Sequence, residues 1–166
     1  MSQTIDIAIE FPDWRSLENP SQLVEDAILA AIAESRAVLA ADAEISVVLC
    51  GDAFIRELNR KWRGRDEPTN VLSFPAGGDL SSAPLLGDII VAFETTAREA
   101  AEAGKPMRDH LAHLVVHGFL HLIGHDHAEM AEAVAMETLE RTILATLGIA
   151  DPYGAALIEE PAGVHE

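Results

Sequence analysis

The feature that most constrains this chain is a dense cluster of histidines at residues 117–127, which read H-G-F-L-H-L-I-G-H-D-H. Apolar residues before and within the cluster recur at helical spacing, so we expect His117 and His121 one turn apart on one helix face. Gly124 follows the last apolar residues, and a glycine at that place typically ends a helix in a left-handed conformation. The turn that follows can bring His127 back towards the first two histidines.

The spacing of His117, His121 and His127, with Gly124 between the last two, is the ligand spacing of the metzincin pattern. Three neutral imidazoles suit Zn²⁺ and leave its fourth position open for water, as a catalytic site requires. A single histidine on an apolar helix is more often a core residue, but packing needs do not readily produce three around a glycine. We therefore predict one catalytic zinc per chain, bound by these three histidines at the end of a central helix.

One part of the metzincin pattern is missing. A metzincin carries Glu directly after its first histidine as the general base. Here that residue is Gly118, which has no side chain that can take a proton. The ligand spacing thus leaves a metallopeptidase or another small-substrate zinc hydrolase as an alternative, and Gly118 argues against it.

The polar residues near the predicted ligands have structural and functional interpretations. Asp126 matches the first residue of a capping box for the last helix, or it orients a ligand histidine or takes a proton from water. His125 lies outside the ligand spacing and is either an exposed turn residue or a proton donor. His110 and His113 precede His117 on the same stripe, but a helix rises about 1.5 Å per residue, which puts them out of reach of one ion.

Hydrophobic periodicity predicts an α+β fold that begins β-α-β-α, with a mixed sheet of about four strands and about five helices. Pro75 cannot donate to a sheet ladder, so it is expected at a strand end or on an edge strand. Asp52 is expected to cap the second helix, whose inner face would be Phe54 or Ile55, Leu58 and Trp62. The predicted strands are residues 5–9, 45–49, 71–75 and 87–93. The predicted helices are residues 20–40, the segment after Asp52, 94–103, the segment from 106 through the histidines, and 136–147.

Length and composition are those of one globular domain. The chain has 166 residues and is 49% hydrophobic, which is enough for a real core. We expect one domain over residues 1–150 and a loose acidic tail over 151–166. No uninterrupted apolar run reaches about 18 residues and no signal-like segment stands at the start, so we expect a cytoplasmic protein. Cys50 ends an apolar run and is expected to be a small core residue without chemistry.

The distribution of charge is uneven. The formal net charge is −17, which argues against nucleic acid, because affinity for a phosphate backbone comes largely from Lys and Arg. However, five of the 11 basic residues lie within residues 56–65: Arg56, Arg60, Lys61, Arg63 and Arg65. This segment is either a basic binding patch or a solvated helix face followed by a polar loop.

Three blocks of the sequence resemble the YbeY family of bacterial rRNA-maturation endoribonucleases. They are the histidine block at 117–127, L-N-R-K-W-R-G-R-D-E-P-T-N-V-L-S-F-P at 58–75, and L-G-D-I-I-V-A at 86–92. The blocks stand in the same order and at similar separations, and the resemblance covers most of the chain. It implies a single zincin-like α+β domain, zinc held by His117, His121 and His127, and a functional arginine at Arg63.

The resemblance also implies hydrolysis of single-stranded RNA, in maturing the 3′ end of small-subunit rRNA and in ribosome quality control. The small ribosomal subunit is then the expected partner, and DNA is not expected. In the predicted chemistry, zinc lowers the pKa of its water, Arg63 holds a phosphate, and Asp126 or His125 handles protons. The residues expected to bind substrate are Arg60, Lys61, Arg65 and Ser73.

Two positions depart from the family pattern. His125 stands where the family commonly has Tyr, and Asn70 stands where Asp often follows Thr69. His125 could therefore add a second proton-transfer group, and the loop could select a different substrate. A further alternative to the nuclease is a non-catalytic ribosome-assembly factor whose zinc holds only the fold.

Overall fold

The fold is built on a four-stranded sheet with strand order β1-β2-β4-β3. The strands are β1 Thr4–Ile9, β2 Glu44–Cys50, β3 Val71–Pro75 and β4 Leu85–Ala92. In this computed structural model, which describes residues 3–126 and 128–153, β1, β2 and β4 are parallel and β3 is antiparallel to β4. The predicted mixed sheet is thus confirmed. Pro75 ends the edge strand β3, where the lack of an N–H costs no hydrogen bond between strands.

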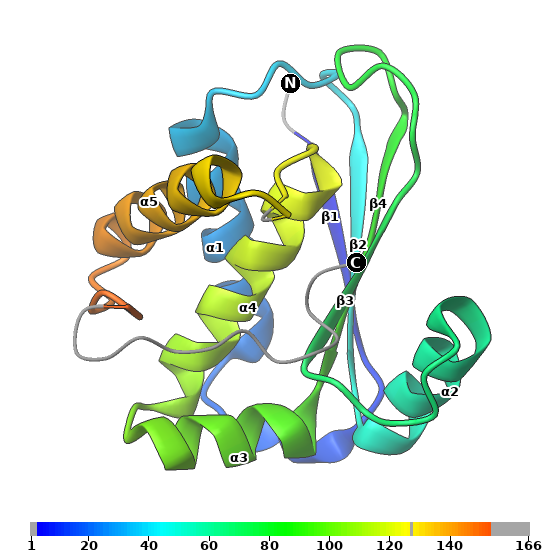
Figure 1. Ribbon diagram of the computed structural model, residues 1–166, viewed down its shortest axis with the longest axis vertical. Helices are drawn as coiled ribbons and strands as arrows, with labels where there is room; N and C mark the ends of the chain where they lie inside the picture. Colours follow the sequence, from blue (N-terminus) through cyan, green and yellow to red (C-terminus); the bar gives the residue numbers. More distant parts are fainter. Residues whose placement is uncertain (1–2, 127, 154–166) are drawn as a thin grey trace.

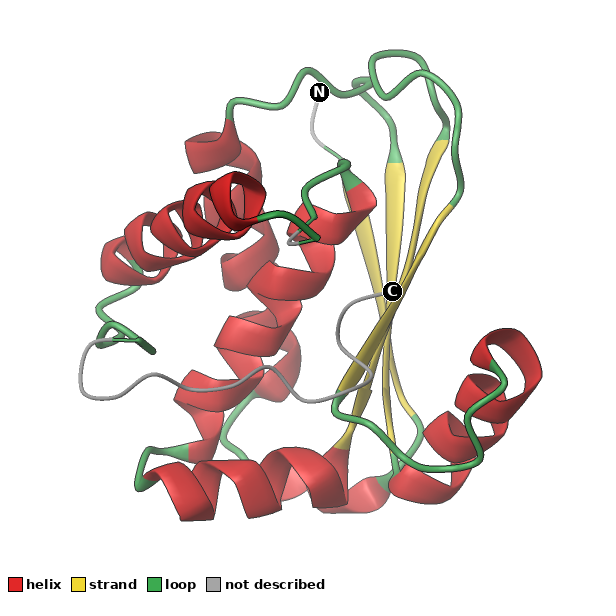
Figure 2. Ribbon diagram, in the orientation of Figure 1, coloured by secondary structure: helices red, strands yellow, loops and turns green. Residues whose placement is uncertain are grey.

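Five α-helices surround the sheet in the described residues, which confirms the predicted α+β fold. Helices α1 and α4 cover one face and α5 packs on these two helices, while α2 lies on the other face and α3 crosses one end of the sheet (Figures 1 and 2). None of these helices is long and apolar enough to cross a membrane. The bounds are α1 Pro20–Ser35, α2 Asp52–Arg63, α3 Phe93–Ala103, α4 Met107–Leu122 and α5 Met130–Thr146, with a short 3-10 helix at Pro12–Ser16.

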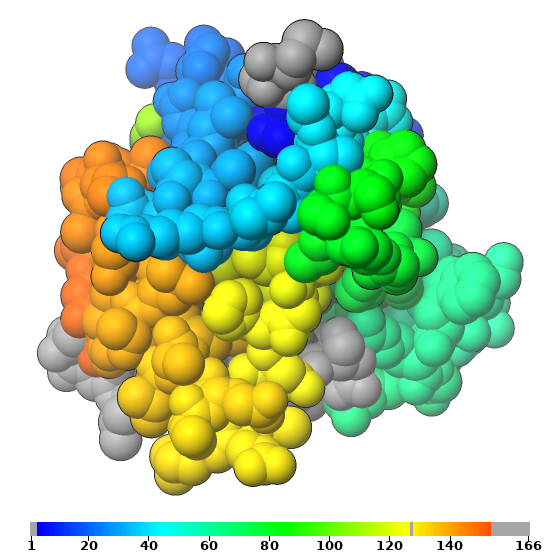
Figure 3. All heavy atoms as spheres, turned by 90° about the horizontal axis from the view of Figure 1, so that it is seen from above, coloured from blue at the N-terminus to red at the C-terminus, as the bar shows by residue number. Residues whose placement is uncertain are grey.

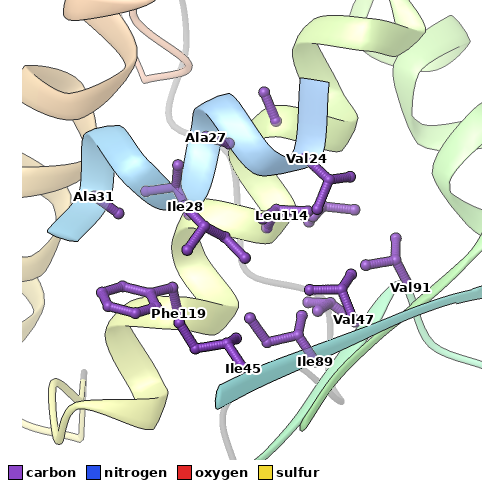
Figure 4. Packing of buried hydrophobic residues seen from close by; sticks show 14 of the residues in the cluster. Val24, Ala27, Ile28, Ala31, Ile45, Val47, Ile89, Val91, Leu114 and Phe119 are labelled. Atoms are coloured by element: carbon purple, nitrogen blue, oxygen red, sulfur yellow. The ribbon is translucent and has the colours of Figure 1, made fainter. Parts of the chain in front are cut away.

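Helix α4 is the centre of the larger hydrophobic core. Its residues are buried without interruption from His110 to Leu120, so it packs on all sides and has no exposed stripe in this part. Phe119 and Leu114 of α4 pack with Ile28 of α1 and with strand residues such as Ile89 (Figure 4). A smaller cluster lies on the opposite face of the sheet and comprises Cys50, Ile55, Leu72, Ile90 and Ala92.

Gly118 allows α4 to approach the sheet closely. A Cβ atom there would lie 2.8 Å from Ile89 Cγ2 and 3.0 Å from Ser73 Oγ, which is closer than ordinary van der Waals contact. Ser73 Oγ donates a hydrogen bond to the Gly118 carbonyl oxygen at 3.1 Å. This position therefore faces the sheet, and a glutamate side chain would have to displace β3 and β4 to fit there.

Several local predictions were wrong for identifiable reasons. Helix α1 ends at Ser35 and not near residue 40, because Arg36 takes a left-handed conformation with φ 57°. On α2, Ile55 and Leu58 pack on the small cluster, which decides between Ile55 and the exposed Phe54, but Trp62 is 62% exposed and does not belong to the inner face. In Figure 1, α2 points away from the sheet towards its C-terminal end.

Two predicted helix caps were also wrong. Gly51 precedes α2, and the Asp52 carboxylate instead accepts hydrogen bonds from Thr95 N at 3.1 Å and from Thr95 Oγ1 at 2.9 Å, at the start of α3. The Asp52 N–H donates to Glu94 Oε1 at 2.7 Å, so the two helix starts stabilise each other. Helix α5 begins after Glu129, which leaves Asp126 in the preceding turn and outside the capping position.

Candidate functional site

Two of the predicted metal ligands meet at the end of α4. His117 and His121 lie one turn apart, and their Nε2 atoms face each other at 3.2 Å. His117 is 3% exposed and His121 is half-buried, so the pair lies between the core and the surface. The helix stops at Leu122, and Gly124 follows with φ 101°, which confirms the turn expected from the glycine. Figure 3 shows the end of α4 and the turn after it reaching the surface beside the β3–β4 loop.

His127, the third predicted ligand, lies outside the described residues. Within residues 3–126 and 128–153, no group of three or more His, Cys, Asp or Glu residues is arranged to hold a metal ion. The three-histidine zinc site therefore stays a prediction, of which the structure describes the first two positions.

A buried glutamate orients His117. His117 Nδ1 donates a hydrogen bond to Glu140 Oε2 at 2.6 Å, and His113 Nε2 donates to Glu140 Oε1 at 3.0 Å. The hydroxyl of Tyr153 donates to the same oxygen, Oε1. Burial opposes the ionisation of Glu140, but the hydrogen bonds from His113 and His117 hold its pKa below the usual value. An ionised carboxylate can only accept, so His117 Nδ1 carries a proton. In the neutral imidazole this leaves the lone pair on Nε2, the atom that faces His121.

Sequence reasoning missed Glu140. It lies on α5 in the same buried stripe as Met136, Ile143 and Leu144, and it is 0% exposed. Glutamate is almost never fully buried without a partner, so an acid inside an apolar helical stripe is the signal that could have revealed it. His113, which the sequence did not predict as a ligand, is part of this network, because it is the second donor to Glu140.

A pocket of about 380 Å³ brings together residues from distant parts of the chain. They come from the end of α2, from β3, and from the end of α4 with the turn that follows. The lining residues are Arg63, Ser73, Phe74, Pro75, His121, Gly124, His125 and Asp126. Most of the predicted catalytic and binding residues that the structure describes thus face one cavity, although roughly 50 residues separate the two halves in sequence.

Arg63 is held in position against β3. Its Nη2 donates to the Ser73 carbonyl oxygen at 3.2 Å, and its Cζ lies 5.7 Å from the centre of the Phe74 ring. Such contacts with a backbone oxygen and an aromatic ring restrict the rotamers of a long side chain. Ser73 is 5% exposed and its hydroxyl bonds α4, so it supports the wall between Arg63 and the histidines.

The other predicted binding residues lie outside the pocket lining. Arg60 forms an ion pair with Glu57 at 2.6 Å, and Arg65 lies 4.0 Å from Glu67. The Lys61 ammonium lies 5.3 Å from the centre of the Trp62 ring. These cations belong to the exposed surface of α2 and the loop after it, and nearby acids compensate part of their charge.

Cys50 has no part in this site. It is buried in the small cluster, and burial, with Glu10 and Asp52 nearby, raises the pKa of its thiol to about 12. The thiol stays protonated at neutral pH, so it is a poor nucleophile, as expected.

The fold and the pocket define a class of protein: an α+β domain with a histidine pair at the end of its buried central helix and an arginine that lines the same cavity. Residues 9–148 match the family model described as Endoribonuclease YbeY. The chain belongs to the YbeY family.

Individual relatives agree with this assignment. The chain is 60% identical to Endoribonuclease YbeY of Methylocella silvestris over 164 residues, which cover 99% of this chain and 93% of that protein. It is 54% identical to Endoribonuclease YbeY of Beijerinckia indica, with 98% and 83% of the two chains covered. A solution structure of a Thermotoga maritima protein is 26% identical, with a TM-score of 0.53 over 90% of this chain and 99% of that one.

Proposed function

We propose that this chain is a zinc-dependent endoribonuclease that cuts single-stranded RNA. Its proposed role is the maturation of the 3′ end of small-subunit rRNA and ribosome quality control in the cytoplasm. Membership of a family described as Endoribonuclease YbeY supports the RNA substrate. The single observation that carries the proposal is the pocket that Arg63 lines together with His121, whose Nε2 faces that of His117.

The described histidines fit a zinc ion. Two imidazole nitrogens bound to one tetrahedral zinc, each at about 2.05 Å, lie about 3.3 Å apart. The Nε2 atoms of His117 and His121 are 3.2 Å apart. The His117–Glu140 bond is the carboxylate–histidine arrangement that fixes the tautomer of metal-binding histidines. His117, His121 and His127 would hold the ion. A bound zinc ion is a Lewis acid that activates water near neutral pH.

The remaining steps are assigned to residues of the chain. Arg63 would hold the scissile or an adjacent phosphate through its guanidinium and offset charge that develops in the transition state. Hydrolysis requires one proton to leave the attacking water and one to reach the departing ribose oxygen. Asp126 and His125 line the same pocket and are the candidates for these two transfers. Arg60, Lys61 and Arg65 would contact phosphates farther along the strand.

The peptidase alternative lacks support at Gly118. The close contacts with Ile89 and Ser73 leave no room there for the glutamate that a metzincin uses. An assembly factor with a purely structural zinc would fold in the same way but would cleave no RNA.

The proposal is tested by cleavage of single-stranded and double-stranded RNA with the zinc-loaded full chain. We expect cleavage of the single strand, and a loss of about a hundredfold or more in kcat/KM with Arg63→Glu and with His121→Ala. Arg98→Glu, at an exposed arginine of α3 outside the pocket, is the matched control and should cleave normally. Mapping the cut on precursor small-subunit rRNA, with metal analysis of the same sample, tests the site and the ion. Equal cleavage by wild type and both pocket variants would sink the assignment.

A further inference from the structure

An exposed tryptophan stands at the end of α2. Trp62 is 62% exposed, whereas the other tryptophan, Trp14, is fully buried. A large aromatic side chain in water forgoes the gain in free energy that burial would give it. Trp62 stands in the last turn of α2, directly before Arg63.

The surroundings of Trp62 connect it to the pocket. Its ring lies 6.5 Å from the ring of Phe74, with an interplanar angle of 64°, and Phe74 lines the cavity. Arg63 lies over the Phe74 ring, and the Lys61 ammonium lies 5.3 Å from the centre of the Trp62 ring. An aromatic surface with two cations beside it therefore continues outward from the pocket.

This combination suits a nucleotide. Proteins that hold single-stranded RNA stack unpaired bases on aromatic rings and place Lys or Arg against the backbone between them. A base has a π-face that Trp62 can contact, and its phosphate carries the charge that Lys61 and Arg63 complement. Bases within a duplex are already stacked on one another, so a double strand cannot offer one to the ring.

We propose that Trp62 is a stacking platform for one base of a single-stranded RNA, adjacent to the phosphate that Arg63 contacts. The inference rests on the proposed function and adds to it a base-binding subsite and a physical reason for single-strand preference. The subsite reads a π-face without hydrogen bonds, so it accepts any base.

The experiment compares Trp62→Ala, Trp62→Phe and Phe54→Ala in the zinc-loaded full chain. Phe54 is the matched control, because it is an exposed aromatic residue on the same helix and does not line the pocket. The substrate is a single-stranded RNA of about ten nucleotides, which spans a typical binding site. The comparison substrate is the same RNA with abasic positions on either side of the cut. Tryptophan fluorescence reports stacking directly, since the buried Trp14 gives a constant background.

We expect RNA to quench the fluorescence of the wild type and to leave that of Trp62→Phe unchanged. Trp62→Ala should raise KM roughly five- to 150-fold with little change in kcat, the cost of losing one stacked base. Trp62→Phe should retain most of the affinity, Phe54→Ala should match the wild type, and the abasic RNA should bind Trp62→Ala and wild type alike.

The opposite results would overturn the inference. If Trp62→Ala has the wild-type KM, Trp62 serves another partner, such as a protein. If it weakens the abasic and the normal RNA equally, the ring acts through the protein and not through a base. A wild type that cuts RNA while Trp62→Ala is unchanged rejects this inference alone, whereas a wild type that neither binds nor cuts RNA rejects the proposed function as well.

Discussion

Replacing Glu140 with glutamine tests whether the buried carboxylate sets the state of His117. The substitution keeps the shape of the side chain but exchanges one acceptor oxygen for an NH₂ group. If the remaining oxygen keeps His113 and Tyr153, which share Oε1, the NH₂ group faces His117 Nδ1. Two donors then face each other, unless the proton of His117 moves to Nε2. That atom needs its lone pair to bind the metal.

The magnitude follows from the bond that is lost. A hydrogen bond to a buried charged group contributes about 1.5–3 kcal/mol to stability. We therefore expect Glu140→Gln to lower the free energy of unfolding by about 2 kcal/mol, and Tm by about 4–8 °C for a chain of this size. Zinc affinity should fall by about 10–100-fold, as is typical when a partner of a metal-binding histidine is removed.

The assay is urea and thermal unfolding of the metal-free protein at neutral pH, with zinc affinity from competition against a chelator. Despite burial, the hydrogen bonds from His113 and His117 hold the folded pKa of Glu140 below the ordinary value of 4.5, so its contribution to stability is fully present at neutral pH and is lost only as the pH falls through the folded pKa. Glu132→Gln, at an exposed acid of the same helix, is the control and should change neither quantity. Equal unfolding midpoints and equal zinc affinities for the two variants would refute the reasoning.

Three further perturbations probe the same framework. Burial lowers the pKa of His110 despite the bond with Glu99, so the unfolded chain takes up this proton first as the pH falls. The free energy of unfolding should therefore decline below about pH 6.5, by at most about 1.4 kcal/mol per pH unit. The urea midpoint of His110→Gln should fall less steeply with decreasing pH than that of the wild type. Gly118→Ala should destabilise by about 1–3 kcal/mol, because its Cβ meets Ile89 and Ser73, and a rise in the urea midpoint would contradict this packing. Zinc at about a hundred times its Kd should stabilise the fold by about 2.7 kcal/mol in thermal unfolding, and an unchanged Tm would count against a metal site.

The sequence was sufficient for the sheet, the central helix and the histidine pair, because each depends on local periodicity. Residues 117–124 contain both the helical spacing and the glycine that ends the helix. The edge position of β3 could likewise be inferred from Pro75. These features are determined by residues that lie close together in the sequence.

The features that could not be predicted depend on how elements meet. Glu140 is paired with His117 across 23 residues, and Asp52 caps a helix that begins 41 residues later at Phe93. Trp62 is 62% exposed, although its helical position is that of an inner residue. Periodicity gives the face of a helix but not the length over which a neighbour covers that face.

The acidity of the chain is reconciled with an RNA substrate by where its charge lies. The formal net charge is −17, and the exposed cations Arg56 and Arg60 of α2 already have Asp66 and Glu57 as partners. A broad basic surface that attracts any nucleic acid is therefore absent from α2. Arg63 differs, because it is half-buried and lines the pocket with His121. Phosphate recognition would then depend on entry into this pocket and on contact with the adjacent aromatic rings, so a strand with accessible bases is favoured over a duplex that offers phosphates alone.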